Sequence, residues 1–198
     1  VAKKGVTEDE VKSNKIAVPG LKTSAFLGIK MCWGDLDYEV VPFDEIIPRI
    51  LDGTYKSGLI IHEGQLTYTQ HDLQVIVNLG VWWNEKTNGL PMPLGGNVVR
   101  RDLGKNVMED ITRYTKMSIE HSIQNPDTAL EFAKKWGRGI DDDTNREFVT
   151  MYVNERTIDY KVDGRESIRQ FLQEGQKIGL IREDFKVDEL KFIGAIEE

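Results

Sequence analysis

Several features that would assign a protein chain to a class at first sight are absent from these 198 residues. The single cysteine, Cys32, excludes an internal disulfide. Its neighbours in the sequence are apolar, so we expect a buried, inert thiol, which fits a reducing compartment. No run approaches the roughly 18 apolar residues of a membrane span, and VAKKGVTEDE lacks the apolar core of a secretory signal. Because the chain opens on Val1 rather than Met, the missing signal says little about where the protein resides.

The chain also has fewer basic than acidic residues. The chain has 26 Lys and Arg against 33 Asp and Glu, a net charge of −7, and its only basic cluster of note is Arg100-Arg101. A protein that binds duplex nucleic acid needs a surplus of basic residues on one face to neutralise phosphates. We therefore expect no nucleic-acid partner, and the lack of a long apolar run predicts no membrane partner.

The familiar ligand-binding and catalytic motifs are missing as well. His62, His71 and His121 are far apart in the sequence and no HExxH occurs, so no metal site is predicted. No GxGxxG, P-loop or GxSxG is present either. The acidic stretch GRGIDDDTN (137–145) lacks the ligand spacing of a calcium loop, and we interpret it as a turn between helices.

What the first half does contain is an alternation of apolar runs with helical patterns. Strand, helix, strand, helix, strand at this spacing predicts βαβ units and a largely parallel sheet. The expected strands are residues 1–4, 15–18, 38–41, 57–61 and 73–80. The expected helices are 8–13 with a Thr7/Glu10 capping box, one from Thr23 or Ser24 to Trp33, one from Asp44 to Gly53, and a short turn or helix at 81–87.

Helices dominate the second half. A stiff loop, NGLPMPLGG (88–96), and a strand, NVVRR (97–101), precede four segments with helical periodicity. These segments are residues 105–124, 126–136, 142–154 and 164–178. If two lobes are present, their boundary is expected near residues 89–97. The predicted fold class is therefore α/β with a mainly helical C-terminal half.

The segment GLIIHEGQLTY (58–68) contains the sharpest candidate for a functional residue. Ligands of parallel sheets bind outside the carboxyl ends of the strands, and the predicted strand delivers His62 to such an end. A neutral imidazole there, with Glu63 beside it, titrates in the range needed for general acid or base catalysis. The alternative is a structural histidine that is hydrogen-bonded at a strand terminus.

A second candidate is PGLKTSA (19–25), where a strand and a Pro-Gly turn lead into a helix. Backbone N–H groups of the first helical turn and the hydroxyls of Thr23 and Ser24 can hold a carboxylate against the positive end of the helix. An ordinary N-cap is the alternative. Because the two strands concerned end at the same edge of a parallel sheet, Thr23 and Ser24 are expected near His62.

LGGN (94–97) is a third candidate. Gly95 and Gly96 let the backbone approach a ligand closely, and Asn97 can both donate and accept hydrogen bonds. The alternative is a hinge-like turn.

Beyond these local patterns, the chain resembles a known family. The segments IAVPGLKTSAFL, GLIIHEGQLTY and VNLGVWWNEKTNGLPMPLGGNVVRRDL are similar to parts of the menaquinone-biosynthesis enzymes with a periplasmic-binding-protein-like fold. The His62-Glu63 pair after an apolar strand and the PMPLGG loop at 91–96 resemble the 1,4-dihydroxy-6-naphthoate synthase branch of that family. The other branch contains the chorismate dehydratases.

The resemblance implies two α/β lobes with a cleft, of the periplasmic-binding-protein type 2 class. It implies a cytoplasmic lyase of the futalosine route that releases 1,4-dihydroxy-6-naphthoate from cyclic dehypoxanthine futalosine, with His62 as the general base. The motif Thr23-Ser24-Ala25 is implied to bind a carboxylate, and no metal or organic cofactor is implied. We include Glu63, Gly95, Gly96 and Asn97 in the expected substrate site.

Several positions depart from the family pattern. Asn78 stands where an Asp commonly precedes Leu-Gly, Lys56-Ser57 replaces an Asp-Ala pair, and Asn88 is an extra residue. Residues 135–138 read Lys-Trp-Gly-Arg where His-Ala-Gln-Glu is common, so no substrate contact is assigned to that helix.

Family members also usually begin with a further segment that builds the sheet of the first lobe. This sequence therefore resembles the latter part of the fold. On that basis residues 5–92 form the second lobe, and residues 1–4 and 93–198 form hinge strands and the helical part of the first lobe.

The main alternative function is a non-catalytic solute-binding protein for a small carboxylate, because the same two-lobed cleft serves both and fold does not determine function. A chorismate dehydratase-type relative is a further alternative. A simple binding protein has little need of a titratable base in its cleft, so His62 favours the enzyme. The expected partner is a small-molecule carboxylate, and the oligomeric state is left open, a homodimer included.

Overall fold

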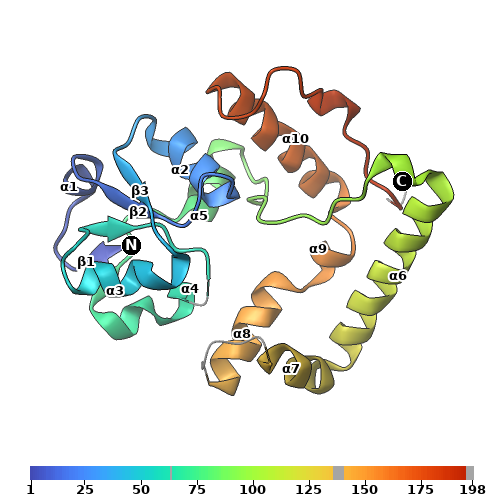
Figure 1. Ribbon diagram of the computed structural model, residues 1–198, viewed down its shortest axis with the longest axis horizontal. Coiled ribbons are helices and arrows are strands. Elements are labelled where there is room, and N and C mark those ends of the chain that lie inside the picture. The colour runs from blue at the N-terminus through green and yellow to red at the C-terminus, as the bar shows by residue number, and fades with distance from the viewer. Residues whose placement is uncertain (63, 136–140, 195–198) are drawn as a thin grey trace. The chain divides into compact units, whose positions relative to one another are not determined.

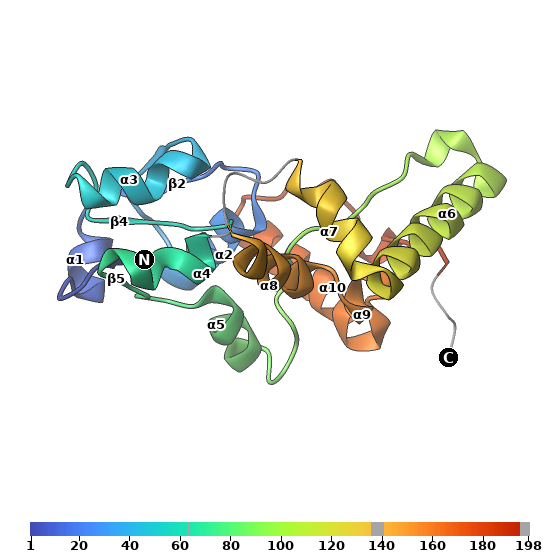
Figure 2. The same ribbon diagram turned by 90° about the horizontal axis from the view of Figure 1, so that it is seen from below.

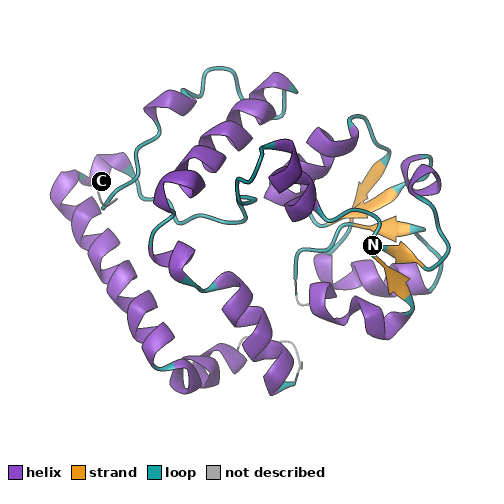
Figure 3. Cartoon of the chain, turned by 180° about the vertical axis from the view of Figure 1, so that it is seen from behind, coloured by secondary structure: helices purple, strands orange, loops and turns teal. Residues whose placement is uncertain are grey.

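A computed structural model describes residues 1–62, 64–135 and 141–194. The chain divides into two compact units, Val1–Leu94 with Gln170–Phe185 and Gly95–Arg169 with Lys186–Glu198. In the part of the chain that the structure describes, every strand belongs to the first unit, and the second unit consists of helices and loops (Figures 1 and 3). The prediction of an α/β chain with a mainly helical C-terminal half is confirmed. The periplasmic-binding-protein class and its lobes stay predictions.

The first unit contains a five-stranded mixed sheet in the order β3-β2-β4-β1-β5. Strand β2 (Ile16–Val18) pairs in parallel with β3 (Tyr38–Val40) and with β4 (Ser57–Gly58). Strand β1 (Ala2–Lys3) runs antiparallel to β4 and to β5 (Leu73–Gln74). The predicted parallel pairing is therefore confirmed for β2, β3 and β4, and β1 is the exception.

Different helices cover the two faces of this sheet, because successive side chains of a strand point to opposite faces. On one face, Ala17 packs with three buried isoleucines of α3 (Ile46–Leu51). On the other face, its neighbours Ile16 and Val18 pack with apolar residues of α1 (Glu8–Lys12) and α2 (Ser24–Trp33). Figure 2 shows α3 and α5 (Leu79–Lys86) on opposite sides of β4. Each buried isoleucine contributes about 1.5–3 kcal/mol, which is enough to hold the short helix α3 on the sheet.

Local signals determine where several helices begin. Thr7 and Glu10 form the predicted capping box: Thr7 Oγ1 accepts the Glu10 N–H at 3.3 Å, and Glu10 Oε2 accepts the Thr7 N–H at 2.9 Å. Of the two predicted caps for α2, Thr23 is the N-cap. The predicted Asp44 cap is wrong, because Phe43–Glu45 forms a 3-10 turn, η1, that runs into α3.

The strand predicted at 73–80 is wrong beyond Gln74. Asn78 accepts hydrogen bonds from the N–H groups of Gly80 and Val81, at 3.0 and 3.2 Å, and starts α5 there. The apolar run before it is used for packing, since Ile76 and Val77 lie against the core on the α2 face. Two short elements, α4 (Gly64–Thr67) and η2 (Tyr68–His71), connect β4 to β5.

The second unit is built from helices that include all four predicted in the second half. They are η3 (Arg101–Leu103), α6 (Lys105–Gln124), α7 (Pro126–Lys134), α8 (Asp142–Tyr152), α9 (Glu155–Ile158), the first part of α10 (Lys161–Lys177), and η4 (Val187–Glu189). From Gln170 onward α10 belongs to the first unit. The strand predicted for 97–101 is wrong: residues 97–100 are irregular and Arg101 begins η3. Val98 is 97% exposed, so no neighbouring strand or core among the described residues holds this segment extended.

The turn predicted at 137–145 falls partly on residues 136–140, which lie outside the described residues. At its end, Asp141 caps α8 by accepting the N–H groups of Asp143 and Thr144 at 3.1 and 2.9 Å. Among residues 1–62, 64–135 and 141–194, no helix is both long and apolar enough to cross a membrane.

Candidate functional site

The carboxyl ends of β2, β3 and β4 share one edge of the sheet because the three strands are parallel. The Val41 N–H donates to the Val18 carbonyl, and the Leu59 N–H donates to the Ala17 carbonyl, both at 2.9 Å. Pairing therefore continues one residue past β3 and β4. His62 follows three residues after Leu59, so it emerges from the carboxyl end of a parallel strand, where the sequence predicts it.

Both ring nitrogens of His62 make hydrogen bonds at this edge. Nδ1 accepts the Gly64 N–H at 3.0 Å, and Nε2 lies 2.9 Å from the Phe43 carbonyl oxygen. For a neutral ring, these two contacts match the tautomer with its proton on Nε2, because an amide N–H needs a lone pair and a carbonyl oxygen needs an N–H. The Phe43 ring lies 5.5 Å from the half-buried imidazole, centroid to centroid. Elements on both sides of the strand end therefore orient the imidazole.

Two glycines of GLIIHEG allow this close packing. A Cβ on Gly58 would overlap Ile46 Cγ2, and a Cβ on Gly64 would lie 2.7 Å from both Ile47 Cδ1 and His62 Cε1. Glycine at position 58 therefore allows α3 to pack closely against β4, and glycine at position 64 allows it to pack against the start of α4. Gly64 also leaves the space that the imidazole occupies.

The second candidate, at the start of α2, has its hydroxyls already engaged. Thr23 Oγ1 accepts the Phe26 N–H at 3.0 Å and donates to the Gly20 carbonyl at 2.9 Å, as an ordinary N-cap does. Ser24 Oγ donates to the Leu94 carbonyl. The groups suited to an anion are therefore the backbone N–H groups of Ser24 and Ala25, which belong to the first helical turn and have no acceptor within the helix.

The hydrogen bond from Ser24 also holds the PMPL loop against α2. Leu94 is the last residue of the first of the two segments that make up the first unit, and a Cβ on Gly28 would lie 3.0 Å from Met92 Cε, so the loop packs along this helix. The loop is therefore held against the N-terminal half of α2, next to the N–H groups of Ser24 and Ala25.

None of the other predicted site residues is described in the first unit. Gly95, Gly96 and Asn97 are exposed and belong to the second unit, and Glu63 lies outside the described residues. Within the second unit, a Cβ on Gly96 would lie 3.1 Å from the Tyr160 hydroxyl, whose pKa is raised by burial. The convergence of all predicted residues in one site stays a prediction.

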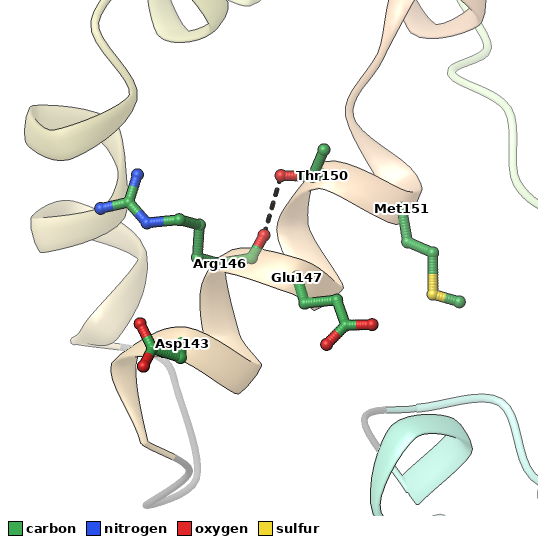
Figure 4. Close-up of a pocket in the computed structure, with 5 residues that line it drawn as sticks. All are labelled: Asp143, Arg146, Glu147, Thr150 and Met151. Atoms are coloured by element: carbon green, nitrogen blue, oxygen red, sulfur yellow. Dashed lines mark hydrogen bonds between the residues drawn. The ribbon is translucent and has the colours of Figure 1, made fainter.

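A surface hollow is present in the second unit on helix α8. Its lining side chains are Asp143, Arg146, Glu147, Thr150 and Met151. All five are exposed and come from this one helix, and Figure 4 shows Arg146 and Glu147 pointing to opposite sides of it. The hollow contains none of the predicted site residues, and an open face of a single helix does not enclose a ligand. We therefore do not assign it a function.

Three residues that contact predicted site residues were missed by the sequence analysis. Phe43 acts through its backbone carbonyl, which every residue has, so no residue type could have marked it. Gly64 could have been found, because a glycine two residues after a candidate base allows another group to approach closely. Tyr160 is 64 residues from Gly96 in the sequence, and only the fold brings the two together.

The similarity to known proteins is extensive. A family described as menaquinone biosynthesis matches residues 1–177. A 1,4-dihydroxy-6-naphtoate synthase of Thermus thermophilus is 31% identical over 166 residues, which cover 84% of this chain and 61% of the relative. A protein of the same name from Streptomyces coelicolor is 29% identical over 178 residues, 87% of this chain and 63% of the relative. The chain therefore spans less than two thirds of the length of these curated relatives.

A solved structure shares the fold. The crystal structure of an Archaeoglobus fulgidus protein is similar with a TM-score of 0.85 and 38% sequence identity, covering 91% of this chain and 67% of that one. The family match extends over most of the chain and includes His62, the first turn of α2 and the PMPLGG loop. This chain belongs to the menaquinone biosynthesis family.

Proposed function

We propose that this chain carries the His62-centred part of a 1,4-dihydroxy-6-naphthoate synthase. In this proposal the enzyme is a cytoplasmic lyase of the futalosine route, acts on cyclic dehypoxanthine futalosine and needs no metal or organic cofactor. Family membership and the two similar synthases support it. The observation that carries it is the position of the His62 imidazole, hydrogen-bonded at the carboxyl edge of a parallel strand, where ligands of such sheets bind.

The chemistry of the edge fits proton abstraction from a carboxylate-bearing substrate. A general base acts through the lone pair of a ring nitrogen, and in the tautomer that matches the two backbone contacts of His62 this lone pair is on Nδ1. The first turn of α2 offers the N–H groups of Ser24 and Ala25 to an anion, and the helix dipole adds to the attraction. In the proposed enzyme, these groups bind the substrate carboxylate while His62 removes a proton.

The alternative is a non-catalytic protein that binds a small carboxylate, or a relative of the chorismate dehydratase type. The N–H groups at the start of α2 suit any of these ligands. His62 separates the enzyme from the binding protein, because carboxylate binding alone requires no titratable base.

The test is the His62→Asn variant of the complete protein. We expect it to abolish the conversion of cyclic dehypoxanthine futalosine, followed by liquid chromatography, while binding of the naphthoate product changes by less than about tenfold. The matched control is His71→Asn, which alters an exposed histidine on η2 and should retain full turnover. Unchanged turnover in His62→Asn would rule out the base, and an inactive wild-type protein that still binds carboxylates would favour the alternative.

A further inference from the structure

The second unit has very little buried apolar surface of its own. Among the residues that the structure describes, its buried apolar side chains are Leu130 of α7 and Val187 of η4. Both clusters of buried apolar side chains lie instead in residues 1–94. Burial of apolar surface is the main favourable contribution to folding, and small units are marginally stable because they bury a smaller fraction of their surface. The helices of this unit therefore need additional apolar contacts to be held together.

Helix α6 carries an apolar face that is open to such contacts. Val107, Ile111 and Tyr114 follow one another at i, i+4 and i+7, so their side chains lie along one side of the helix. All three are exposed, Ile111 to 41% and Tyr114 to 60%. The Arg113 guanidinium lies 4.7 Å from the centre of the Tyr114 ring, but it belongs to the same helix and leaves the ring accessible. We call Val107, Ile111 and Tyr114 the α6 stripe.

The rest of the second unit packs against a different side of α6. A Cβ on Gly194 would lie 3.0 Å from Thr112 Cγ2, and Met108 and Ile119 are half-buried. Thr112 lies about 100° around the helix from Ile111, because an α-helix has about 3.6 residues per turn. Burial by the described residues therefore ends at the edge of the α6 stripe, and the stripe remains open to a partner.

The relatives of this chain indicate what that partner is. The chain matches 61% and 63% of the two synthases and 67% of the Archaeoglobus fulgidus protein, so about a third of each relative lies outside the match. The matched part of the solved structure has the fold described above, with a TM-score of 0.85. A helix with one apolar stripe must bury that stripe against another element. The part of the relatives outside the match is polypeptide that accompanies these helices in the family.

We propose that the α6 stripe is an interaction surface for the third of the family fold that lies outside the match, and that this segment packs an apolar face against Val107, Ile111 and Tyr114. The inference goes beyond the proposed function and does not depend on His62 acting as a base. A second copy of this chain is the competing occupant. The unmatched segment is favoured because the three relatives carry it in addition to the part that matches.

Co-expression tests this surface. The segment of the Archaeoglobus fulgidus protein outside the match is produced with an affinity tag in the same cells as this chain, and the material that copurifies is measured by light scattering. We expect a complex of one copy of each, in which hydrogen exchange of residues 105–124 is slower than in the chain alone. The absence of a complex, or unchanged exchange along α6 within it, would overturn the proposal.

Two matched variants test the α6 stripe itself. Ile111→Glu places a charge where the apolar face of the partner is expected, so it should lower the affinity by about tenfold or more. Ile123→Glu is the control, because Ile123 is also 41% exposed and lies on the same helix, about 120° from Ile111. It should change the affinity by less than about threefold. Equal losses in the two variants would refute the role of the α6 stripe.

Further measurements separate the alternatives. Both isoleucines are exposed, so circular dichroism and the urea midpoint of each variant alone should match the wild type. Copurification is scored for both variants in the same cells, so a chain that is insoluble alone is still tested. If the wild-type chain forms a dimer that Ile111→Glu dissociates, the occupant is a second copy and the proposal is wrong.

The outcomes also distinguish this inference from the proposed function. The His62→Asn variant should bind the segment as the wild type does, since His62 belongs to the first unit. If the complex forms but His62→Asn retains turnover, the proposed function fails and the α6 surface stands. If His62 is essential but the segment does not bind, or binds without Ile111, the α6 surface is wrong and the base stands.

Discussion

Ser57 is a polar residue in a position where the sheet needs an apolar one. It lies on β4 between β1 and β2, is 2% exposed, and its hydroxyl is the one buried side-chain polar atom without a hydrogen-bond partner among the described residues. A buried hydroxyl without a partner costs about 1–3 kcal/mol. We expect Ser57→Ala to raise the free energy of unfolding by about 1 kcal/mol, measured by urea denaturation.

Ser167 provides the control for this prediction. It is as deeply buried as Ser57 but has a polar partner, so Ser167→Ala should lower the free energy of unfolding by about 1 kcal/mol. If Ser57→Ala destabilises the protein as much as Ser167→Ala does, the Ser57 hydroxyl has a partner after all.

At the scale of the element, one side chain decides where β5 ends and α5 begins. Asn78 accepts two first-turn N–H groups, which satisfies donors that the helix cannot pair internally. Asn78→Ala should therefore lower the free energy of unfolding of the first unit by about 1 kcal/mol, measured by thermal or urea denaturation. The residue type that the family commonly has here, aspartate, caps helices equally well.

The matched variant is Asn78→Asp, which keeps the acceptor oxygen and adds a negative charge at a helix N-terminus. It should match or slightly exceed the wild-type stability. A loss in Asn78→Asp as large as that in Asn78→Ala would show that the amide group, rather than its cap hydrogen bonds, is needed.

The extra residue Asn88 lies just after the end of α5. It adopts a φ of 57°, a conformation that asparagine tolerates better than most residues.

At the scale of the whole molecule, the first unit needs residues from both ends of the chain. Phe171 of α10 is buried against Trp83 of α5, with ring centroids 5.1 Å apart in an edge-to-face arrangement. Gly175, one helical turn further, allows α10 to approach Leu27 of α2. We expect Phe171→Ala to lower the free energy of unfolding of the first unit by about 3–5 kcal/mol, followed by tryptophan fluorescence in urea.

Phe132 of α7 is the comparison residue in the second unit. It is 63% exposed, so Phe132→Ala should change the stability by less than about 0.5 kcal/mol. Equal effects of the two substitutions would mean that residues 170–185 do not complete the core of the first unit.

The sequence by itself determined the elements whose signals are local. The capping box at Thr7 and Glu10 marks α1, the periodicity over 105–124 matches the bounds of α6, and the apolar runs locate β2, β3 and β4. These signals suffice because a cap or a stripe depends on residues a few positions apart. His62 at a strand end followed from the same pattern. The strand predicted at 97–101 failed because strand formation requires a partner, and no local pattern reports one.

The tertiary structure alone decided which groups surround these residues. Phe43 offers its carbonyl to His62 because β3 and β4 are parallel and both lie beside β2, a pairing that joins residues 19 positions apart. The hydroxyl of Ser24, expected to face an anion, instead donates to Leu94, 70 residues away. The contact of His62 Nε2 therefore depends on a backbone carbonyl that is distant in the sequence. Sequence patterns determine which chemical groups are available, whereas the packing of distant segments determines which of their atoms are already engaged in hydrogen bonds within the protein.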